Sequence, residues 1–221
     1  MYHKFTIIIA VFFLVFSSCT KDNTITNNYS KFGSITTQLA AKSLSATVGT
    51  TVNNSSCDTL GIDGFSDASL DENLLLVRLF TDSNHLWGYF VSRATALASA
   101  NSKIEIAVDN SKTAVKFVYG SVIDSTGQYL VLNNNTFANI IPYSFFSSET
   151  PVSSAWLQQF PNSQDSGYVG YRITNAYGTF YGWLQLSVQV SVNSVTINIP
   201  AFARYNVYGR AILAGYTFPA Q

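Results

Sequence analysis

The sequence contains few charged residues and few of the residue types that most catalytic and metal sites require. Only 11% of the 221 residues are charged, with twelve basic and twelve acidic side chains. We expect no nucleic-acid partner, because no basic patch can neutralise several phosphates. With His3 and His85 as the two histidines, a zinc site built from several histidines is excluded. A Ser-His-Asp triad would depend on His85, and no Gly-x-Ser-x-Gly motif accompanies it, so we predict no catalytic residue.

The N-terminus has the features of a lipoprotein signal peptide. Met1–Lys4 is basic, and Phe5–Phe16 is an apolar run that is too short to span a bilayer of roughly 30 Å as a helix. The small residues Ser17 and Ser18 precede Cys19. This ending resembles the lipobox of bacterial lipoproteins, although Phe16 stands where Leu, Val or Ile is commonest. The alternative is an ordinary cleaved signal peptide with a chance cysteine.

The resemblance implies that Cys19 carries acyl chains and holds the protein on a membrane. The stretch Cys19-Thr20-Lys21-Asp22 is similar to the start of mature Bacteroidota lipoproteins, in which charges soon after the cysteine imply export to the outer membrane and display on the cell surface. The periplasmic leaflet is the alternative location. With Cys19 lipidated, Cys57 lacks an intrachain disulfide partner, and we interpret it as a buried thiol, with an intermolecular bridge as the alternative.

Composition divides the chain into residues 1–18 (signal peptide), 19–56 (lipidated N-terminus and tether) and 57–221 (one domain). More than half of residues 20–56 are Ser, Thr or Asn, which predicts a flexible tether. The apolar residues Leu39, Leu44 and Val48 leave open a short element that packs on the domain.

The domain is predicted to be all-β, a single antiparallel β-sandwich of jelly-roll-like type. Aromatic residues reach 14%, and short apolar segments alternate with Asn, Asp, Ser and Gly clusters. The predicted strands are Leu74–Thr81, Leu86–Ser92, Lys103–Val108, Ala114–Ile123, Gln128–Leu132, Tyr168–Thr174, Tyr181–Ser191, Ser194–Ile199 and Ala211–Phe218. Residues 192–194 predict a tight hairpin, and Ala94–Ala100 is the one stretch that favours helix.

The C-terminal part contains a recognisable pattern. It reads Tyr168-Val-Gly-Tyr-Arg, then Tyr181-Gly-Trp183-Leu-Gln-Leu, and later Gly209-Arg-Ala-Ile-Leu-Ala-Gly215. This pattern is similar to a group of secreted bacterial β-sandwich domains, and the resemblance implies a fold class and an extracellular setting but no chemistry. We expect Trp183 to lie in the core with its indole N–H on a carbonyl, rather than to stack on a ligand.

Acidic residues give weak candidates for chemistry. Asp58, Asp63 and Asp67 belong to an acidic segment at residues 58–72, interpreted as a solvated loop, with calcium binding as the alternative and no other cofactor expected. Glu105 alternates with Lys103 and is expected to be a solvated cross-strand charge rather than part of a glycosidase pair.

Two positions match an acceptor pattern for bacterial O-glycosylation. Thr59 and Ser125 each follow an aspartate, as in the Asp-Ser/Thr-apolar acceptors of Bacteroidota secreted proteins. The Ser125 site is the poorer match, because Thr126 is not a large apolar residue.

Aromatic residues provide the remaining binding candidates. Trp87 with Tyr89, Trp156 with Phe160, and Tyr205 form a possible saccharide platform, because aromatic faces contact the C–H groups of sugar rings. The favoured interpretation is that these rings fill the core, because at 14% aromatic content most rings must be buried.

The sequence thus predicts a lipid-anchored, non-enzymatic surface module with a structural or adhesive role, whose partner is an envelope protein or a polysaccharide. A carbohydrate-binding lipoprotein of a glycan-uptake system is the first alternative, and a glycoside hydrolase-like enzyme is the second.

Overall fold

The chain folds into antiparallel β-sheets, which confirms the predicted all-β class. The computed structural model describes residues 29–32, 35–47, 56–62, 73–81, 85–94, 103–133, 135–145, 155–156, 163–175, 178–191 and 194–217. The strands are β1 (Tyr29–Phe32), β2 (Ile35–Thr47), β3 (Ser56–Ile62), β4 (Asn73–Thr81), β5 (His85–Ala94), β6 (Lys103–Ala107), β7 (Lys116–Phe117), β8 (Val122–Ile123), β9 (Tyr129–Val131), β10 (Ala138–Phe145), β11 (Ser163–Asn175), β12 (Gly178–Val190), β13 (Ser194–Tyr205) and β14 (Ile212–Leu213). The described part of the chain contains no helix with the length and apolarity needed to cross a membrane.

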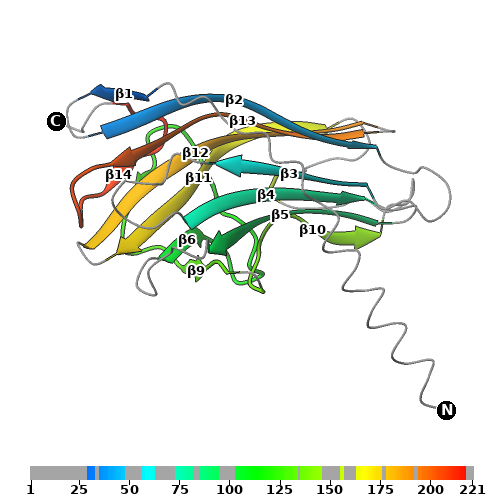
Figure 1. Cartoon of the computed structure of the whole chain (residues 1–221), viewed down its shortest axis with the longest axis horizontal. Coiled ribbons are helices and arrows are strands. Elements are labelled where there is room, and N and C mark those ends of the chain that lie inside the picture. The colour runs from blue at the N-terminus through cyan, green and yellow to red at the C-terminus, as the bar shows by residue number, and fades with distance from the viewer. Residues whose placement is uncertain are drawn as a thin grey trace, which may run out of the picture.

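The strands belong to one large sheet, one small sheet and a short two-stranded ribbon. The large sheet has the order β1-β2-β13-β12-β11-β6-β9, with β7 also pairing with β11, and the small sheet has the order β10-β5-β4-β3. Figure 1 shows the small sheet as a second layer beside the large one. Consecutive strands are neighbours in both β3-β4-β5 and β11-β12-β13. The described strand order establishes these meanders, while the jelly-roll likeness stays a prediction.

A hydrophobic core fills the space between the two sheets. Its members are buried apolar residues on the facing sides of both sheets, among them Leu75, Val77, Leu79, Phe90 and Ile141 from the small sheet and Ile104, Ile106, Leu184, Leu186, Val188 and Ile197 from the large sheet. On β12, Leu184, Leu186 and Val188 point inward in alternation, as the period of two predicts. A Cβ atom built on Gly88 of β5 would lie 3.3 Å from Ile197 Cδ1 of β13, so the sheets are in close contact.

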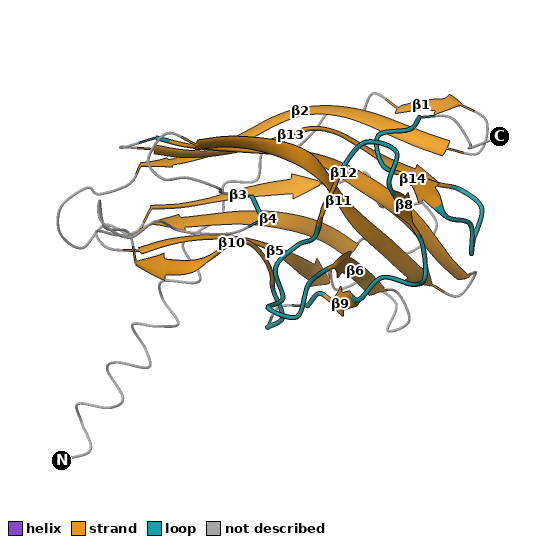
Figure 2. Cartoon of the chain, turned by 180° about the vertical axis from the view of Figure 1, so that it is seen from behind, coloured by secondary structure: helices purple, strands orange, loops and turns teal. Residues whose placement is uncertain are grey.

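A second apolar cluster covers the outer face of the large sheet. Tyr181 and Trp183 of β12 pack there with Ile123 of β8 and Ile212 of β14, which pair with each other. Figure 2 shows the loops that carry β8 and β14 next to the large sheet. The Trp183 indole N–H donates to the carbonyl oxygen of Tyr216 at 3.0 Å. Trp183 is therefore buried with its indole N–H on a carbonyl, as predicted, but it lies in this outer cluster rather than at the core between the sheets.

Tyr171 and Gly182 form a close cross-strand contact in the large sheet. The two residues are directly opposite each other on β11 and β12. Tyr171 is fully buried, and its hydroxyl donates to the Ala203 carbonyl oxygen at 2.9 Å. A Cβ atom at position 182 would lie 2.2 Å from Tyr171 Cζ, so only glycine fits beneath this ring.

Several predicted strands are found with shifted ends. The hairpin between β12 and β13 is confirmed, because Val190 pairs with Val195 and the Ser191 N–H donates to the Ser194 carbonyl oxygen at 2.8 Å. The single strand predicted at Ala114–Ile123 is instead β7 and β8, separated by a turn in which Gly120 has a φ of 83°. The final predicted strand, Ala211–Phe218, shortens to β14.

The structure differs from the predicted tether at residues 35–47. This segment is the 13-residue strand β2, which pairs with β13 from Ile35↔Tyr205 to Thr47↔Ser194. Leu44 is buried between exposed Ser43 and Ser45, and the Ser45 hydroxyl lies 3.0 Å from that of Thr196. The Ser/Thr-rich composition here thus belongs to a strand with one solvent-facing side. The tether prediction is wrong for this segment, and the alternative left open by the sequence, an element packed on the domain through Leu44, is confirmed.

Three further strands, β1, β3 and β10, were not predicted. β3 includes Asp58 and Thr59, which pair with Leu79 and Arg78 of β4, so the acidic segment does not begin as a loop. β10 contains Pro142, which has no backbone N–H to donate, but β10 lies at a sheet edge with irregular register around Ile141, where proline is tolerated. In the stretch with helical preference, Ala94 is the last residue of β5, and residues 95–100 lie outside the described residues.

Candidate functional site

The candidate site is an aromatic cluster on the outer face of the small sheet. Side chains on β5 alternate, so Leu86 and Phe90 enter the core between the sheets while Trp87, Tyr89 and Val91 point outward. Tyr89 and Val91 are buried in this outer cluster, and Trp87 is half-buried.

Three aromatic rings of the cluster are in mutual contact. The ring centroids of Trp87 and Tyr89 are 4.1 Å apart. Phe137 meets both rings nearly edge-on, with centroid distances of 5.4 Å to Trp87 and 4.9 Å to Tyr89. Edge-to-face and offset pairs of this kind are favourable and fix the orientation of the rings. Burial raises the pKa of the Tyr89 phenol, although the nearby Arg78 charge opposes this shift, so Tyr89 is neutral at physiological pH.

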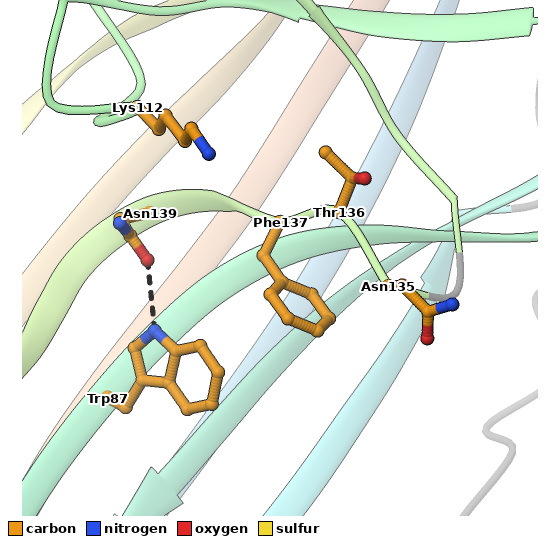
Figure 3. A pocket seen from close by; sticks show the side chains of 6 residues that line it. All are labelled: Trp87, Lys112, Asn135, Thr136, Phe137 and Asn139. Atoms are coloured by element: carbon orange, nitrogen blue, oxygen red, sulfur yellow. Dashed lines mark hydrogen bonds between the residues drawn. The ribbon is translucent and has the colours of Figure 1, made fainter.

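Asn139 of β10 holds the Trp87 indole in place. The indole N–H donates to Asn139 Oδ1 at 2.9 Å, as Figure 3 shows. This bond uses the amide oxygen, and an asparagine amide also carries an NH₂ group with two donor hydrogens. The backbone of Asn139 is fixed as well, since its N–H donates to the Lys112 carbonyl at 2.8 Å and its carbonyl accepts from the Ala114 N–H at 2.7 Å.

The turn at residues 109–113 brings a lysine to the cluster. Asp109 Oδ1 accepts hydrogen bonds from the Ser111 N–H at 2.8 Å and the Thr113 N–H at 2.9 Å. The Lys112 N–H donates to the Asp109 carbonyl at 3.0 Å, and Lys112 has a φ of 59°. This network gives the turn one defined conformation.

A hollow of about 280 Å³ lies between this turn and the aromatic rings. Its lining consists of Trp87, Lys112, Asn135, Thr136, Phe137 and Asn139, drawn in Figure 3. The lining combines apolar ring surface with amide and hydroxyl groups and one cation. Such a mixture of aromatic and convergent polar groups is typical of sites for small polar ligands, and the volume is close to the lower end for such pockets.

The structure separates the three residues of the predicted aromatic platform. Trp156 is fully buried between the sheets, where its indole N–H donates to the Ala114 carbonyl at 2.9 Å, so the core interpretation is confirmed for this residue and a place in a surface platform is wrong. Tyr205 packs at the outer cluster of the large sheet, on the other side of the molecule from Trp87. Trp87 and Tyr89 do lie together as the sequence suggested, and their partners are Phe137 and Asn139.

The described carboxylates are engaged in structural contacts. Glu105 accepts two hydrogen bonds from the guanidinium of Arg172, directly opposite on β11, at 2.6 and 2.8 Å, so it is a cross-strand charge as predicted. It is only 6% exposed, so its prediction as a solvated charge is wrong. The bond to Glu105 raises the pKa of Arg172. Arg172 also stacks on the Tyr129 ring, 4.3 Å from its centroid. Asp165 pairs with Lys116.

The remaining predicted residues fall in different places. Cys19, Asp63 and Asp67 lie outside the described residues, while Cys57, Asp58 and Thr59 lie on β3. Within the described residues, no three acidic, histidine or cysteine side chains form a group suited to a metal ion.

Ser125 is exposed in a turn that the preceding aspartate stabilises. Asp124 Oδ1 accepts hydrogen bonds from the Thr126 N–H and hydroxyl at 2.8 and 2.7 Å. These bonds lower the pKa of Asp124. The O-glycosylation of Thr59 and Ser125 stays a prediction.

Sequence reasoning missed Phe137, Asn139 and Lys112. The available signals were the Asn-rich turn before Phe137 and the turn sequence Asp109-Asn-Ser-Lys-Thr113, both of which indicate loops without showing that they meet Trp87. Comparisons with known proteins give no further guide, since no family model, curated protein or solved structure matches the chain.

Proposed function

We propose that this protein is a cell-envelope lipoprotein whose β-domain binds saccharides in the hollow beside Trp87. The lipobox ending at Cys19 supports the envelope anchor. The hollow supports saccharide binding, because it places the aromatic surface of Trp87 and Phe137 beside the amides of Asn135 and Asn139. Aromatic surface contacts sugar C–H groups, and amides exchange hydrogen bonds with sugar hydroxyls.

The observation that carries this proposal is the fixed orientation of Trp87. A tryptophan that only filled space would need no specific partner at its N–H beyond any nearby carbonyl. Here the N–H is held by a side-chain amide that itself lines the hollow. The indole and the amide are therefore preorganised together, which lowers the entropy cost of ordering them around a ligand.

The proposal is tested by measuring saccharide binding to the purified full chain in mild detergent. A panel of polysaccharides and oligosaccharides is screened by glycan array, and hits are measured by calorimetry. The variant Trp87→Val keeps a residue that favours strands and should weaken binding by at least about tenfold, a typical effect for loss of a central aromatic contact. The control Tyr119→Ser changes an exposed aromatic residue near the outer cluster of the large sheet and should leave binding unchanged. Absence of binding across the panel, or equal binding by Trp87→Val, would contradict the proposal.

A structural or adhesive role is the second candidate, and an exposed apolar turn favours it. Val118, Tyr119 and Val122 are 69%, 63% and 55% exposed. Tyr119 stacks on Tyr216 with ring centroids 5.0 Å apart, so the turn presents a rigid apolar surface. Exposed apolar groups that cluster in this way are typical of protein interaction sites. Under this role, Tyr119→Ser should abolish capture of an envelope protein partner by the chain, while Trp87→Val should not.

A further inference from the structure

The charge of the candidate site comes from a single residue. Lys112 is exposed and is the one charged side chain among the described residues that line the hollow. The nearest acidic residue in sequence, Asp109, uses Oδ1 to accept two backbone N–H groups of its own turn. The described lining therefore presents a positive charge without a facing carboxylate, and a ligand with a negative charge complements it.

The backbone at Lys112 is in a conformation that lysine rarely adopts. Its φ of 59° lies in the left-handed region, which is disfavoured for a residue with a Cβ atom. Glycine or asparagine at this position would fit the turn at lower cost. A function of the lysine side chain would offset this strain.

The turn that carries Lys112 is joined directly to the residues that orient Trp87. The Lys112 carbonyl accepts the Asn139 N–H, and Thr113 forms a parallel bridge with Asn139. Asn139 in turn holds the Trp87 indole through its side chain. Figure 3 shows the Lys112 side chain reaching toward the hollow from the side opposite Trp87. Hydrogen bonds through Asn139 thus connect the turn that carries Lys112 to the Trp87 ring.

We infer that the saccharide bound in this hollow is acidic and carries a carboxylate, as a hexuronic acid residue does. This inference rests on the proposed saccharide function. The sugar ring lies against Trp87 and Phe137, and its carboxylate accepts a charge-assisted hydrogen bond from the Lys112 ammonium group. Such bonds are about twice as strong as neutral ones, so the cation selects acidic over neutral sugars.

The test compares uronic acid oligosaccharides with neutral counterparts of the same shape. Oligosaccharides of galacturonate, glucuronate, mannuronate and guluronate are each paired with the carboxyl-reduced form, which lacks only the charge. Calorimetry on the full chain should show at least about tenfold tighter binding for at least one acidic form than for its neutral partner. The preference should shrink as salt concentration rises, since the pair is exposed. A sulfated neutral oligosaccharide that binds as tightly as the uronates would overturn the assignment to a carboxylate.

Variants at position 112 distinguish the effect of the lysine charge on binding from an effect on folding. Lys112→Gln should bind the acidic and reduced forms equally, whereas Lys112→Arg should keep the preference. Lys112→Gly should also lose the preference, and its melting temperature should not fall, because glycine accepts the left-handed φ. Lys103→Gln is the matched control, since Lys103 is an exposed lysine outside the hollow and its loss should leave the preference intact.

The outcomes distinguish the two proposals. If acidic and neutral sugars bind equally and Lys112→Gln changes nothing, saccharide binding stands and the inference about charge is refuted. If no saccharide binds, saccharide binding itself fails, and the charge inference falls with it.

Discussion

The contact between Gly182 and Tyr171 gives the sharpest prediction about stability. In Gly182→Ala the new Cβ atom would lie 2.2 Å from Tyr171 Cζ and 2.4 Å from the Ala203 carbonyl oxygen. Both distances are far below contact distance. The Ala203 oxygen belongs to the neighbouring strand β13, and the Tyr171 ring is buried and hydrogen-bonded to that same oxygen, so neither atom can move aside easily.

The expected loss in the free energy of unfolding follows from these two contacts. Overpacking of a well-packed interior costs typically about 1–3 kcal/mol, and the upper end applies because a backbone atom is involved. Displacement of the Tyr171 hydroxyl from Ala203 adds about 1 kcal/mol for the lost hydrogen bond. We therefore expect Gly182→Ala to lower the free energy of unfolding by about 4 kcal/mol, and the melting temperature by roughly 8–16 °C.

Urea unfolding followed by tryptophan fluorescence measures this loss. Gly127→Ala is the control, since Gly127 is exposed and a Cβ atom there would lie 3.2 Å from the half-buried Tyr129 ring, a much smaller overlap than at position 182, so the free energy of unfolding should fall by no more than about 1 kcal/mol. In a Tyr171→Leu background, Gly182→Ala should cost at least about 1 kcal/mol less, because the ring contact is gone. A cost below about 1 kcal/mol in the parent chain, or an equal cost in both backgrounds, would refute the reasoning.

Three other predictions concern buried polar groups. Glu105→Gln breaks the charge pair with Arg172 and should cost about 2 kcal/mol in urea unfolding at pH 7, below the full value for a buried pair because the Arg172 side chain is 25% exposed. Trp156→Phe leaves the buried Ala114 carbonyl without its indole donor and should cost about 1–3 kcal/mol, while saccharide affinity stays unchanged in calorimetry. Burial raises the pKa of Tyr171, so the folded state keeps a proton that the unfolded chain releases above about pH 10. Stability should therefore fall as pH rises beyond that value, by up to about 1.4 kcal/mol per pH unit, and Tyr171→Phe should remove this part of the slope in urea midpoints between pH 9 and 11.

The strands with strict alternation could be predicted from the sequence, and those with mixed composition could not. β12 repeats Leu184, Leu186 and Val188 against polar neighbours, and this period alone identifies a strand with one buried face. In β2, Ser43-Leu44-Ser45 also alternates polar and apolar residues. Small polar residues surround this short pattern, however, and their abundance predicts a tether. Pairing with β13 decides its structure, and pairing between segments about 150 residues apart is not visible in local sequence.

The candidate site was predictable only in the part that lies on one strand. Trp87 and Tyr89 are two residues apart, so they share a face of β5 wherever that strand lies. Whether that face is covered depends on β10 and on the turn at residues 109–113, which reach it through tertiary packing. For Trp156 the sequence offered no means of distinguishing surface from core. The residues around it show no regular alternation of apolar and polar side chains, and its hydrogen-bond partner Ala114 is 42 residues away.

The outer faces of the two sheets differ in a way that supports a binding role for the small one. On the large sheet, Tyr181 and Trp183 are covered by Ile123 and Ile212, so these two buried rings are explained by packing alone. On the small sheet, Trp87 is only half-buried and borders the hollow. β-Branched residues would form this strand equally well and would leave less apolar surface beside water. An aromatic ring that is held by a side-chain amide and lines the same hollow as a lysine therefore supports the proposed binding site.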